Sequence, residues 1–323
     1  MSRHVVVVVI RFVATAAVLA VAAVGGFLLL HDGVGRDVAR VSAFPAEDTR
    51  PPATPSEDLT LLLLGQDWSP EAEQHGRSDA ILLVRIPWHR STVTIVSIPR
   101  DSWVTLPGYG EAKINSALPL GGPPLAVATV EDLTGIRVDH VAMIDGDGFR
   151  ALTDALGGVT VEIPETVHDS ARGVTWTAGT HRLDGAAALD YVGQRYGLDG
   201  GDLDRVRRHQ NVLRAMATEL LGLDALADPR TVHRLVGAAT DSIVVDEEWS
   251  ADEMRELARS LQYLGQSGLT FTTVPVAGLD QVGGQSVVRL DRARAAELWT
   301  AIREDWGPEW VEQSGVALAP SVP

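Results

Sequence analysis

The chain of 323 residues contains no cysteine. This absence excludes disulfide bonds, zinc–thiolate sites and a thiol nucleophile, although it does not identify a compartment.

Basic side chains are outnumbered by acidic ones, because the chain has 27 Lys and Arg residues against 43 Asp and Glu residues, which gives a formal net charge of −16. A nucleic-acid-binding protein neutralises phosphates with a broad basic surface, so this balance argues against nucleic acid as a partner. A local group of arginines in this chain must therefore serve a local anion.

A long stretch without charged residues lies near the amino terminus. Residues 12–30 read FVATAAVLAVAAVGGFLLL, which is about the length needed to cross a bilayer roughly 30 Å thick. Arg3 and Arg11 precede this stretch and favour a cytoplasmic amino end, although arginines also follow it. A cleaved signal peptide is the competing interpretation, because small residues near 21–25 suit a peptidase, but the apolar run continues beyond them. We predict a short cytoplasmic segment over 1–11, an uncleaved transmembrane helix over 12–30, and a location outside the membrane for the rest.

Prolines gather just after this stretch. Residues 31–58 contain Pro45, Pro51, Pro52 and Pro55 among Asp, Glu, Ser and Thr. This composition predicts an extended extracytoplasmic spacer that carries no chemistry of its own.

From residue 59 onward, apolar runs of strand length alternate with helix-like stretches. Such alternation indicates an α/β fold, in which helices cover both faces of a central sheet. No proline-rich linker interrupts residues 59–305, so we expect a single domain, with core motifs over 59–220 and a carboxyl-terminal part over 228–305 that completes it. Residues 306–323 are expected to form a loose tail.

Three early apolar runs have the length and the Leu or β-branched content of buried strands: residues 59–64, 80–86 and 92–98. The Gly- and Pro-rich residues 103–124 are expected to form a long ordered loop. The other predicted elements are, in chain order, a helix over 125–133 ended by Gly135, a strand over 138–144, a helix over 148–156, a strand over 159–163, helices from 183 including an amphipathic one over 203–220, helices over 230–240 and 251–264, strands over 270–276 and 286–290, and a helix over 291–302.

Polar residues stand where the first three strands begin or end. If these strands share a sheet, their carboxylates and guanidinium groups collect along one rim. Carboxylates suit a hard cation that keeps some of its waters, and arginine presents a planar fork that matches phosphate oxygens. We therefore predict a metal and phosphate site at this rim, against the alternative that these are solvated loop residues or structural ion pairs. The residues concerned are Gly65, Asp67, Arg77, Ser78, Asp79, Pro99, Arg100 and Asp101.

Seven motifs, taken in order, resemble the LytR-CpsA-Psr family of cell-envelope glycopolymer transferases. They read LLLLGQD, GRSDAILLVRI, VSIPRDSWV, LPGYGEAKINSAL, GGVTVEIPE, LDGAAALDYVGQRYGL and GDLDRVRRHQ. The resemblance implies an extracytoplasmic α/β domain with a central mixed sheet. It also implies transfer of a phospho-linked glycopolymer from a polyprenyl-pyrophosphate carrier in the membrane to a peptidoglycan hydroxyl. The implied cofactor is Mg²⁺, with Mn²⁺ as an alternative.

The resemblance further implies roles for individual residues. Asp67 and Asp79 match the carboxylates that hold the metal ion. The residues implied to bind the pyrophosphate are Arg77, Arg100, Lys113, Asn115, Arg195, Arg205, Arg208, His209 and Gln210. Those implied to act in catalysis are Arg77, Arg100, Asp101, Arg195 and Asp202. Asp101, Lys113 and Asn115 are expected to support the others, and Asp101 has the strongest alternative as a residue that only caps or pairs with a neighbour.

Two positions depart from the family pattern. Gly193 stands where the family has the first arginine of an Arg-x-Arg pair, so one charge-assisted phosphate contact is missing. His209 stands between Arg208 and Gln210, and either compensates in part for that loss or is an ordinary helix histidine. The missing arginine keeps two other hypotheses open: a family member that binds the lipid-linked glycan without turnover, and a pyrophosphatase that releases the phosphoglycan to water.

A polyprenyl chain also needs an apolar groove. Leu118, Leu120, Leu125, Val141 and Ile144 are available for it, but residues of this kind at these spacings more often belong to a plain core. The sequence does not separate the two interpretations.

Overall fold

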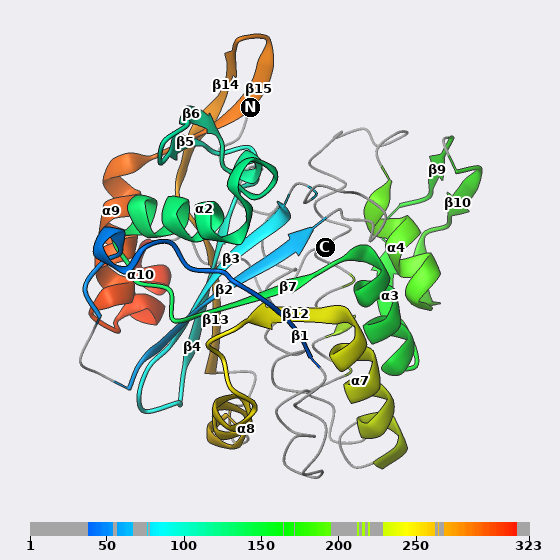
Figure 1. Ribbon diagram of the computed structural model, residues 1–323. Helices are drawn as coiled ribbons and strands as arrows, with labels where there is room; N and C mark the ends of the chain where they lie inside the picture. The colour runs from blue at the N-terminus through cyan, green and yellow to red at the C-terminus, as the bar shows by residue number, and fades with distance from the viewer. Residues whose placement is uncertain are drawn as a thin grey trace.

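The computed structural model describes residues 38–53, 57–66, 76, 78–163, 165–170, 172–194, 212, 215–216, 219, 229–261, 264 and 268–314. Its centre is a seven-stranded sheet in the order β1-β12-β7-β2-β3-β4-β13 (Figure 1). The strands are β1 (Ala39–Val41), β12 (Ile243–Asp246), β7 (His140–Ile144), β2 (Leu59–Gln66), β3 (Ser78–Ile86), β4 (Val93–Ile98) and β13 (Leu269–Thr273). The pairs β1·β12, β2·β7 and β4·β13 are parallel and the others antiparallel, so the sheet is mixed, as predicted.

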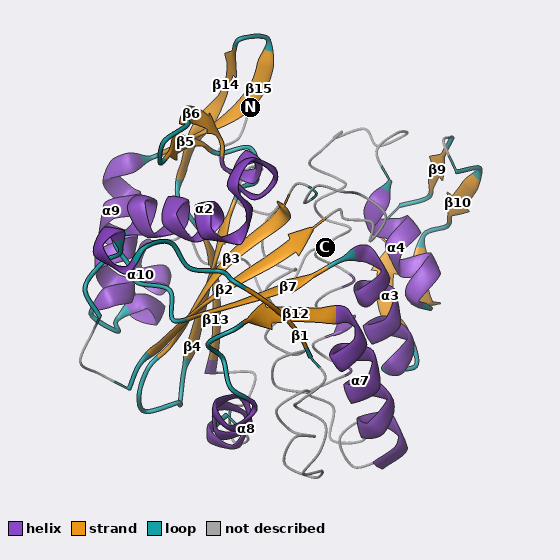
Figure 2. Cartoon of the chain, viewed as in Figure 1, coloured by secondary structure: helices purple, strands orange, loops and turns teal. Residues whose placement is uncertain are grey.

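Two helical layers cover the sheet, which confirms the α/β prediction (Figure 2). One layer contains α2 (Ala117–Thr134), α9 (Arg292–Arg303) and α10 (Gly307–Ser314). The other contains α3 (Gly146–Ala155), α4 (Gly185–Gly193), α7 (Pro229–Ser242) and α8 (Ala251–Ser260).

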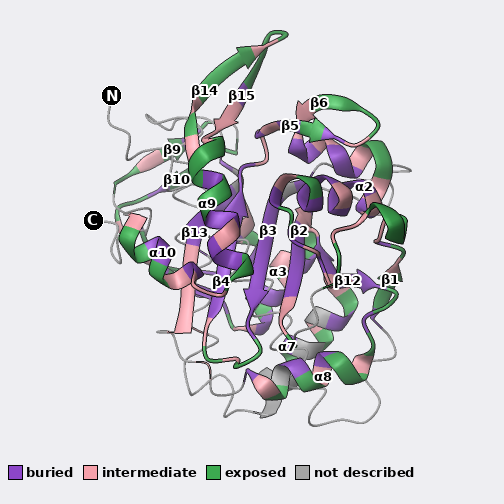
Figure 3. Cartoon of the chain, turned by 90° about the vertical axis from the view of Figure 1, so that its left-hand side faces the viewer, coloured by how far each residue is buried: buried purple, intermediate pink, exposed green. Residues whose placement is uncertain are grey.

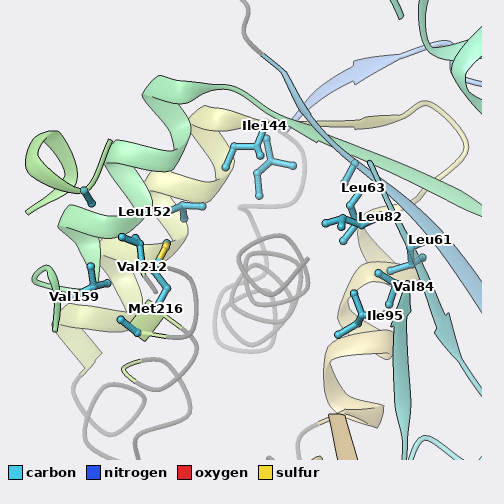
Figure 4. Close-up of a cluster of buried hydrophobic side chains, with 14 of the residues drawn as sticks. Leu61, Leu63, Leu82, Val84, Ile95, Ile144, Leu152, Val159, Val212 and Met216 are labelled. Carbon is cyan, nitrogen blue, oxygen red and sulfur yellow. The ribbon is translucent and has the colours of Figure 1, made fainter. Parts of the chain in front are cut away.

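Strands β2, β3 and β4 are buried on both faces (Figure 3), which explains why their sequences are continuous apolar runs rather than alternating ones. Successive side chains of a strand point to opposite faces, so Leu62 and Leu64 join the core beneath α2. Leu61 and Leu63 join the core on the other face, with Leu152 of α3 (Figure 4).

Several helix ends follow local sequence signals. The carboxylates of Asp145 and Asp184 accept hydrogen bonds from backbone N–H groups in the first turns of α3 and α4. Helix α2 ends at Gly135, which adopts a left-handed conformation with φ of 63°. Helix α2 begins at Ala117, earlier than the predicted span 125–133, and its axis is kinked at Gly121 and Gly122.

Four two-stranded sheets surround the central one. They are β5 (Trp103–Leu106) with β6 (Gly110–Lys113), β8 (Val159–Ile163) with β11 (Gly179–Leu183), β9 (Val167–Asp169) with β10 (Val174–Trp176), and β14 (Val276–Val282) with β15 (Gln285–Leu290). Residues 103–124 are therefore not a long loop. A hairpin turn with positive φ at Gly108 and Gly110 joins β5 to β6, and the 3-10 helix η4 (Ile114–Ser116) leads into α2.

The predicted spacer over 31–58 is wrong for the part that the structure describes. Strand β1 is an edge strand of the central sheet, and a 3-10 helix, η3 (Glu47–Thr49), follows it. The guanidinium of Arg50 binds the carboxylate of Glu131 at 2.9 Å, with both side chains at most 4% exposed. Proline-rich sequence predicted an extended chain, but these tertiary contacts make it part of the domain.

The predicted loose tail over 306–323 is likewise wrong over residues 307–314. These residues form α10, and its Trp310 and Val311 side chains are buried in the core beneath α2 and α9.

The predicted transmembrane helix over 12–30 lies outside the described residues. Across the residues that the structure does describe, no helix combines the length and apolar character needed to cross a membrane.

Candidate functional site

The predicted rim exists as one edge of the central sheet. Gln66 at the end of β2 pairs with Ser78 at the start of β3, and Ile81 of β3 pairs with Ile98 at the end of β4. The carboxyl ends of β2 and β4 therefore meet the amino end of β3, which confirms that the three runs share a sheet. The carboxyl ends of β7 and β13 reach the same edge, because Ile144 pairs with Gly65 and Thr273 with Ser97.

A β-bulge interrupts β3 at the rim. Gly65 pairs with Ala80 but Gln66 pairs with Ser78, so Asp79 is the extra residue and has no partner in the register. Bulges are common next to active sites, because they turn a side chain away from the regular alternation. Asp67, Arg77 and the side chain of Asp79 lie outside what the structure describes.

The turn after β4 carries Arg100 and Asp101 and is held from two sides. On one side, the backbone N–H of Asn115 donates to the carbonyl oxygen of Arg100 at 3.1 Å, and that of Ile114 donates to Ser102 at 2.9 Å. On the other, the backbone N–H of Val288 in β15 donates to the carbonyl oxygen of Asp101 at 2.8 Å. Segments far apart in sequence thus fix this turn.

The side chains on this turn form a small ionic cluster. Lys113 Nζ lies 2.9 Å from Asp101 Oδ1, and Arg100 Nε lies 3.9 Å from Asp101 Oδ2. The three side chains are 19–27% exposed, so the cluster is open to solvent on one side. Lys113 is the only lysine in the chain. Asp101 therefore forms ion pairs with its neighbours, in agreement with the alternative that it pairs rather than acts in catalysis. These ion pairs also keep two cations together.

Two amide oxygens at the rim are buried and have no hydrogen-bond partner among the residues that the structure describes. They are Oδ1 of Asn115, a side chain 4% exposed, and Oε1 of Gln66, a side chain 8% exposed. An unpaired buried acceptor is costly and is suited to a donor that arrives with a ligand. Sequence reasoning missed Gln66, although a polar residue at the end of an apolar run was a usable signal.

The third predicted part of the site lies on and after α4. Tyr191 is buried and packs edge-on against the indole of Trp176, with ring centroids 5.1 Å apart. Gly193, which replaces the family arginine, is the last residue of α4, and the following Gln194 is fully buried. The predicted site residues beyond them lie outside the described residues: Arg195, Asp202, Arg205, Arg208, His209 and Gln210.

The candidate groove residues fall into two groups, buried and exposed. Leu118, Leu125, Val141 and Ile144 are buried in the two cores, in agreement with the plain interpretation. Leu120 is 48% exposed and belongs to neither.

No group of three or more His, Asp or Glu side chains that could hold a metal ion occurs within the described part of the chain. Asp67 and the side chain of Asp79 lie outside those residues, so the predicted ligands remain a prediction.

A mixed sheet between two helical layers, with cations gathered at one rim, defines an α/β protein with a candidate anion-binding site. The chain belongs to the LytR_cpsA_psr family, whose model matches residues 37–304.

Similar proteins include the cell wall biosynthesis protein LcpA of Corynebacterium glutamicum, which is 33% identical over 299 residues, covering 83% of this chain and 56% of LcpA. The chain thus spans little more than half the length of that relative. The polyisoprenyl-teichoic acid–peptidoglycan teichoic acid transferase TagU of Oceanobacillus iheyensis is 30% identical, covering 66% of this chain and 70% of TagU. Among solved structures, the LytR-Csp2A-Psr enzyme from Actinomyces oris has a TM-score of 0.65 at 25% identity, covering 82% of this chain and 95% of that one.

Proposed function

We propose that the protein transfers a phospho-linked glycopolymer from a polyprenyl-pyrophosphate carrier to a peptidoglycan hydroxyl during cell-wall assembly. The observation that supports this most directly is the ionic cluster at the rim, in which Asp101 holds the cations of Arg100 and Lys113 together. Membership of the family and the transferase name of the TagU relative point to the same reaction.

In the proposed reaction, the acceptor hydroxyl oxygen bonds to the phosphorus that carries the glycan. The bond from that phosphorus to the bridging oxygen breaks, polyprenyl phosphate leaves with the electron pair, and the proton of the hydroxyl passes to water. Negative charge grows on the departing phosphate, so fixed cations close to it lower the barrier. Arg100 presents a planar fork of donors, and Asp101 keeps Lys113 beside it.

We also propose a magnesium ion beside the bulge, because carboxylates are ligands that this cation prefers. Asp67 and Asp79 would hold it, and the unpartnered Gln66 Oε1 is suited to accept a hydrogen bond from one of its waters. When bound, Mg²⁺ would neutralise charge on the pyrophosphate oxygens. We further propose that residues 12–30 anchor the chain in the membrane, with the domain on the extracytoplasmic side.

Purified full-length protein in detergent tests the reaction. With Mg²⁺ and a polyprenyl-pyrophosphate-linked glycan, we expect release of polyprenyl phosphate and attachment of the glycan to added peptidoglycan fragments. Release without attachment would favour a pyrophosphatase, and tight binding without release would favour a scaffold protein.

The glycine at position 193 supports a second candidate, a family member with weakened activity. Gly193→Arg restores the guanidinium that the family pattern has at this place. A higher transfer rate in this variant would show that the glycine is a functional loss, whereas an unchanged rate would show that another group already supplies the charge.

A further inference from the structure

Four large apolar side chains are strongly exposed within the described residues: Trp88, Tyr109, Leu120 and Leu279. Trp88 lies in the turn between β3 and β4, at the opposite end of the sheet from the rim. Tyr109 and Leu279 lie in hairpins whose first strands closely follow rim strands, and Leu120 lies in the first turn of α2. Strand β5 begins five residues after β4 ends, and β14 begins three residues after β13 ends.

Tyr109 and Leu120 form one apolar corner. Tyr109 lies in the turn of the β5–β6 hairpin, and its hydroxyl donates a hydrogen bond to the carbonyl oxygen of Leu120 at 3.1 Å. Leu120 precedes the kink of α2 at Gly121 and Gly122. The corner therefore combines an aliphatic side chain with a tyrosine, which prefers the boundary between apolar and aqueous surroundings.

Leu279 extends from the second hairpin, which is fixed to the candidate site. Leu279 pairs with Val288, whose N–H donates to the carbonyl oxygen of Asp101. Across the hairpin, Asp280 accepts from Arg289 Nε at 2.9 Å. Both hairpins project from the same end of the molecule (Figures 1 and 3).

The first described strand also begins along the rim edge of the sheet. A continuous row of partners runs from Ala39 through Val244, Met143, Leu64 and Ile81 to Ile98, next to the rim. The start of β1 therefore lies on the same side as the candidate site.

The uncharged stretch ends at Leu30, eight residues before Val38. Eight residues reach at most about 29 Å when fully extended. A bilayer that held residues 12–30 would thus lie close to the rim end.

We propose that Tyr109, Leu120 and Leu279 form a seating surface that contacts the outer leaflet of the membrane. Contact at these points holds the rim against the lipid, where a pyrophosphate on a lipid carrier is presented. The contact is apolar rather than ionic, because a chain with a net charge of −16 is not attracted to anionic lipid. This inference rests on the proposed anchor but not on turnover at the site.

The absence of cysteine allows a clean test with single-cysteine variants. Leu279→Cys and Leu120→Cys report on the seating surface. Trp88→Cys is the matched control, because Trp88 is 64% exposed and Leu279 is 65% exposed. Each full-length variant is labelled with an environment-sensitive fluorophore and reconstituted in phosphatidylcholine vesicles with nitroxide-bearing lipids.

We expect blue-shifted emission and loss of fluorescence to the lipid nitroxide at positions 120 and 279, unchanged in high salt, with neither effect at position 88. Equal quenching at all three positions, or quenching at position 88 alone, would overturn the proposal. Protein that is removed from the vesicles by alkaline washing would overturn it as well, since the anchor on which it rests would be missing.

Failure of the proposed reaction is distinguishable from failure of the seating surface. The same vesicles are assayed for polyprenyl phosphate release, and quenching at positions 120 and 279 without release would leave the surface intact while rejecting the transferase. The variant Leu279→Asp is expected to slow release from vesicle-embedded carrier but not from a short, water-soluble carrier analogue. Equal slowing of both would overturn the inference.

Discussion

At the scale of single residues, Asp101 stands between the only lysine of the chain and an arginine of the same turn. We predict that Asp101 and Lys113 act as a unit on the position of Arg100. Asp101→Asn and Lys113→Met should each slow transfer, and the double variant should be little worse than either alone. A partly exposed pair contributes at most about 1 kcal/mol to stability, so melting temperatures should change little. Transfer rates in a double-mutant cycle measure the coupling, and additive losses would refute it.

Arg100 itself is predicted to contact the pyrophosphate. Arg100→Ala should lower the turnover rate by about 10²–10³-fold, the usual effect of removing one donor that faces a developing charge. Arg100→Lys should restore only part of the rate, because an ammonium lacks the planar fork. Arg150→Ala, on the exposed face of α3, is the control and should retain full activity. A normal rate in Arg100→Ala would remove this residue from the site.

At the scale of elements, Gly135 ends α2 in a left-handed conformation with φ of 63°. A side chain at this position adopts that conformation at a cost of roughly 1–2 kcal/mol. A Cβ atom there would also lie 3.3 Å from Arg303 Nη1, whose N–H donates to the carbonyl oxygen of Thr134. Gly135→Ala should therefore lower the free energy of unfolding.

Gly237 in α7 provides the matched comparison, because a Cβ atom there meets nothing within 4 Å and its φ is not positive. Gly237→Ala should raise the free energy of unfolding by about 0.8–1.0 kcal/mol, the helix propensity difference. Denaturant unfolding of both variants measures the contrast, and equal shifts would contradict it.

At the scale of the whole molecule, the Arg50–Glu131 pair joins the first described segment to α2. Both side chains are almost fully buried, and Glu131 also accepts a hydrogen bond from the backbone N–H of Val138 at 2.9 Å. Arg50→Met leaves the carboxylate of Glu131 without its cation and should cost about 3–5 kcal/mol. Arg137→Met, on a solvent-facing ion pair with Glu47, should cost less than about 1 kcal/mol. Thermal unfolding of the full chain decides whether this segment is part of the domain or only a tether.

The ionisation of Asp139 should make the stability of the fold depend on pH. Burial raises the pKa of this carboxyl, although its Oδ2 accepts a hydrogen bond from the backbone N–H of Thr60 at 2.7 Å. An acid with a raised pKa in the folded state binds more protons when folded than when unfolded, so its ionisation destabilises the fold as the pH rises.

Asp139→Asn keeps an acceptor for Thr60 but cannot ionise. The melting temperature of this variant relative to the unmodified protein should therefore rise as the pH is increased from about 3.5 to about 7. A difference that is constant across this range would show that the carboxyl titrates normally in the fold.

The sequence by itself determined the class of fold and the residues of the three rim strands. Their continuous Leu, Ile and Val runs can be buried on both faces only in a sheet covered by two layers, so local composition carries that information. The end of α2 at Gly135 was likewise readable, because capping acts within one turn.

Only the tertiary structure decided what depends on partners distant in sequence. Strand β1 forms because it pairs with β12, and helix α10 forms because Trp310 enters a core. Neither contact is visible in the local sequence that predicted a spacer and a tail. The bulge at Asp79 and the pairing of Lys113 with Asp101 arise in the same way. Register and side-chain pairing are properties of two segments together, so no single segment encodes them.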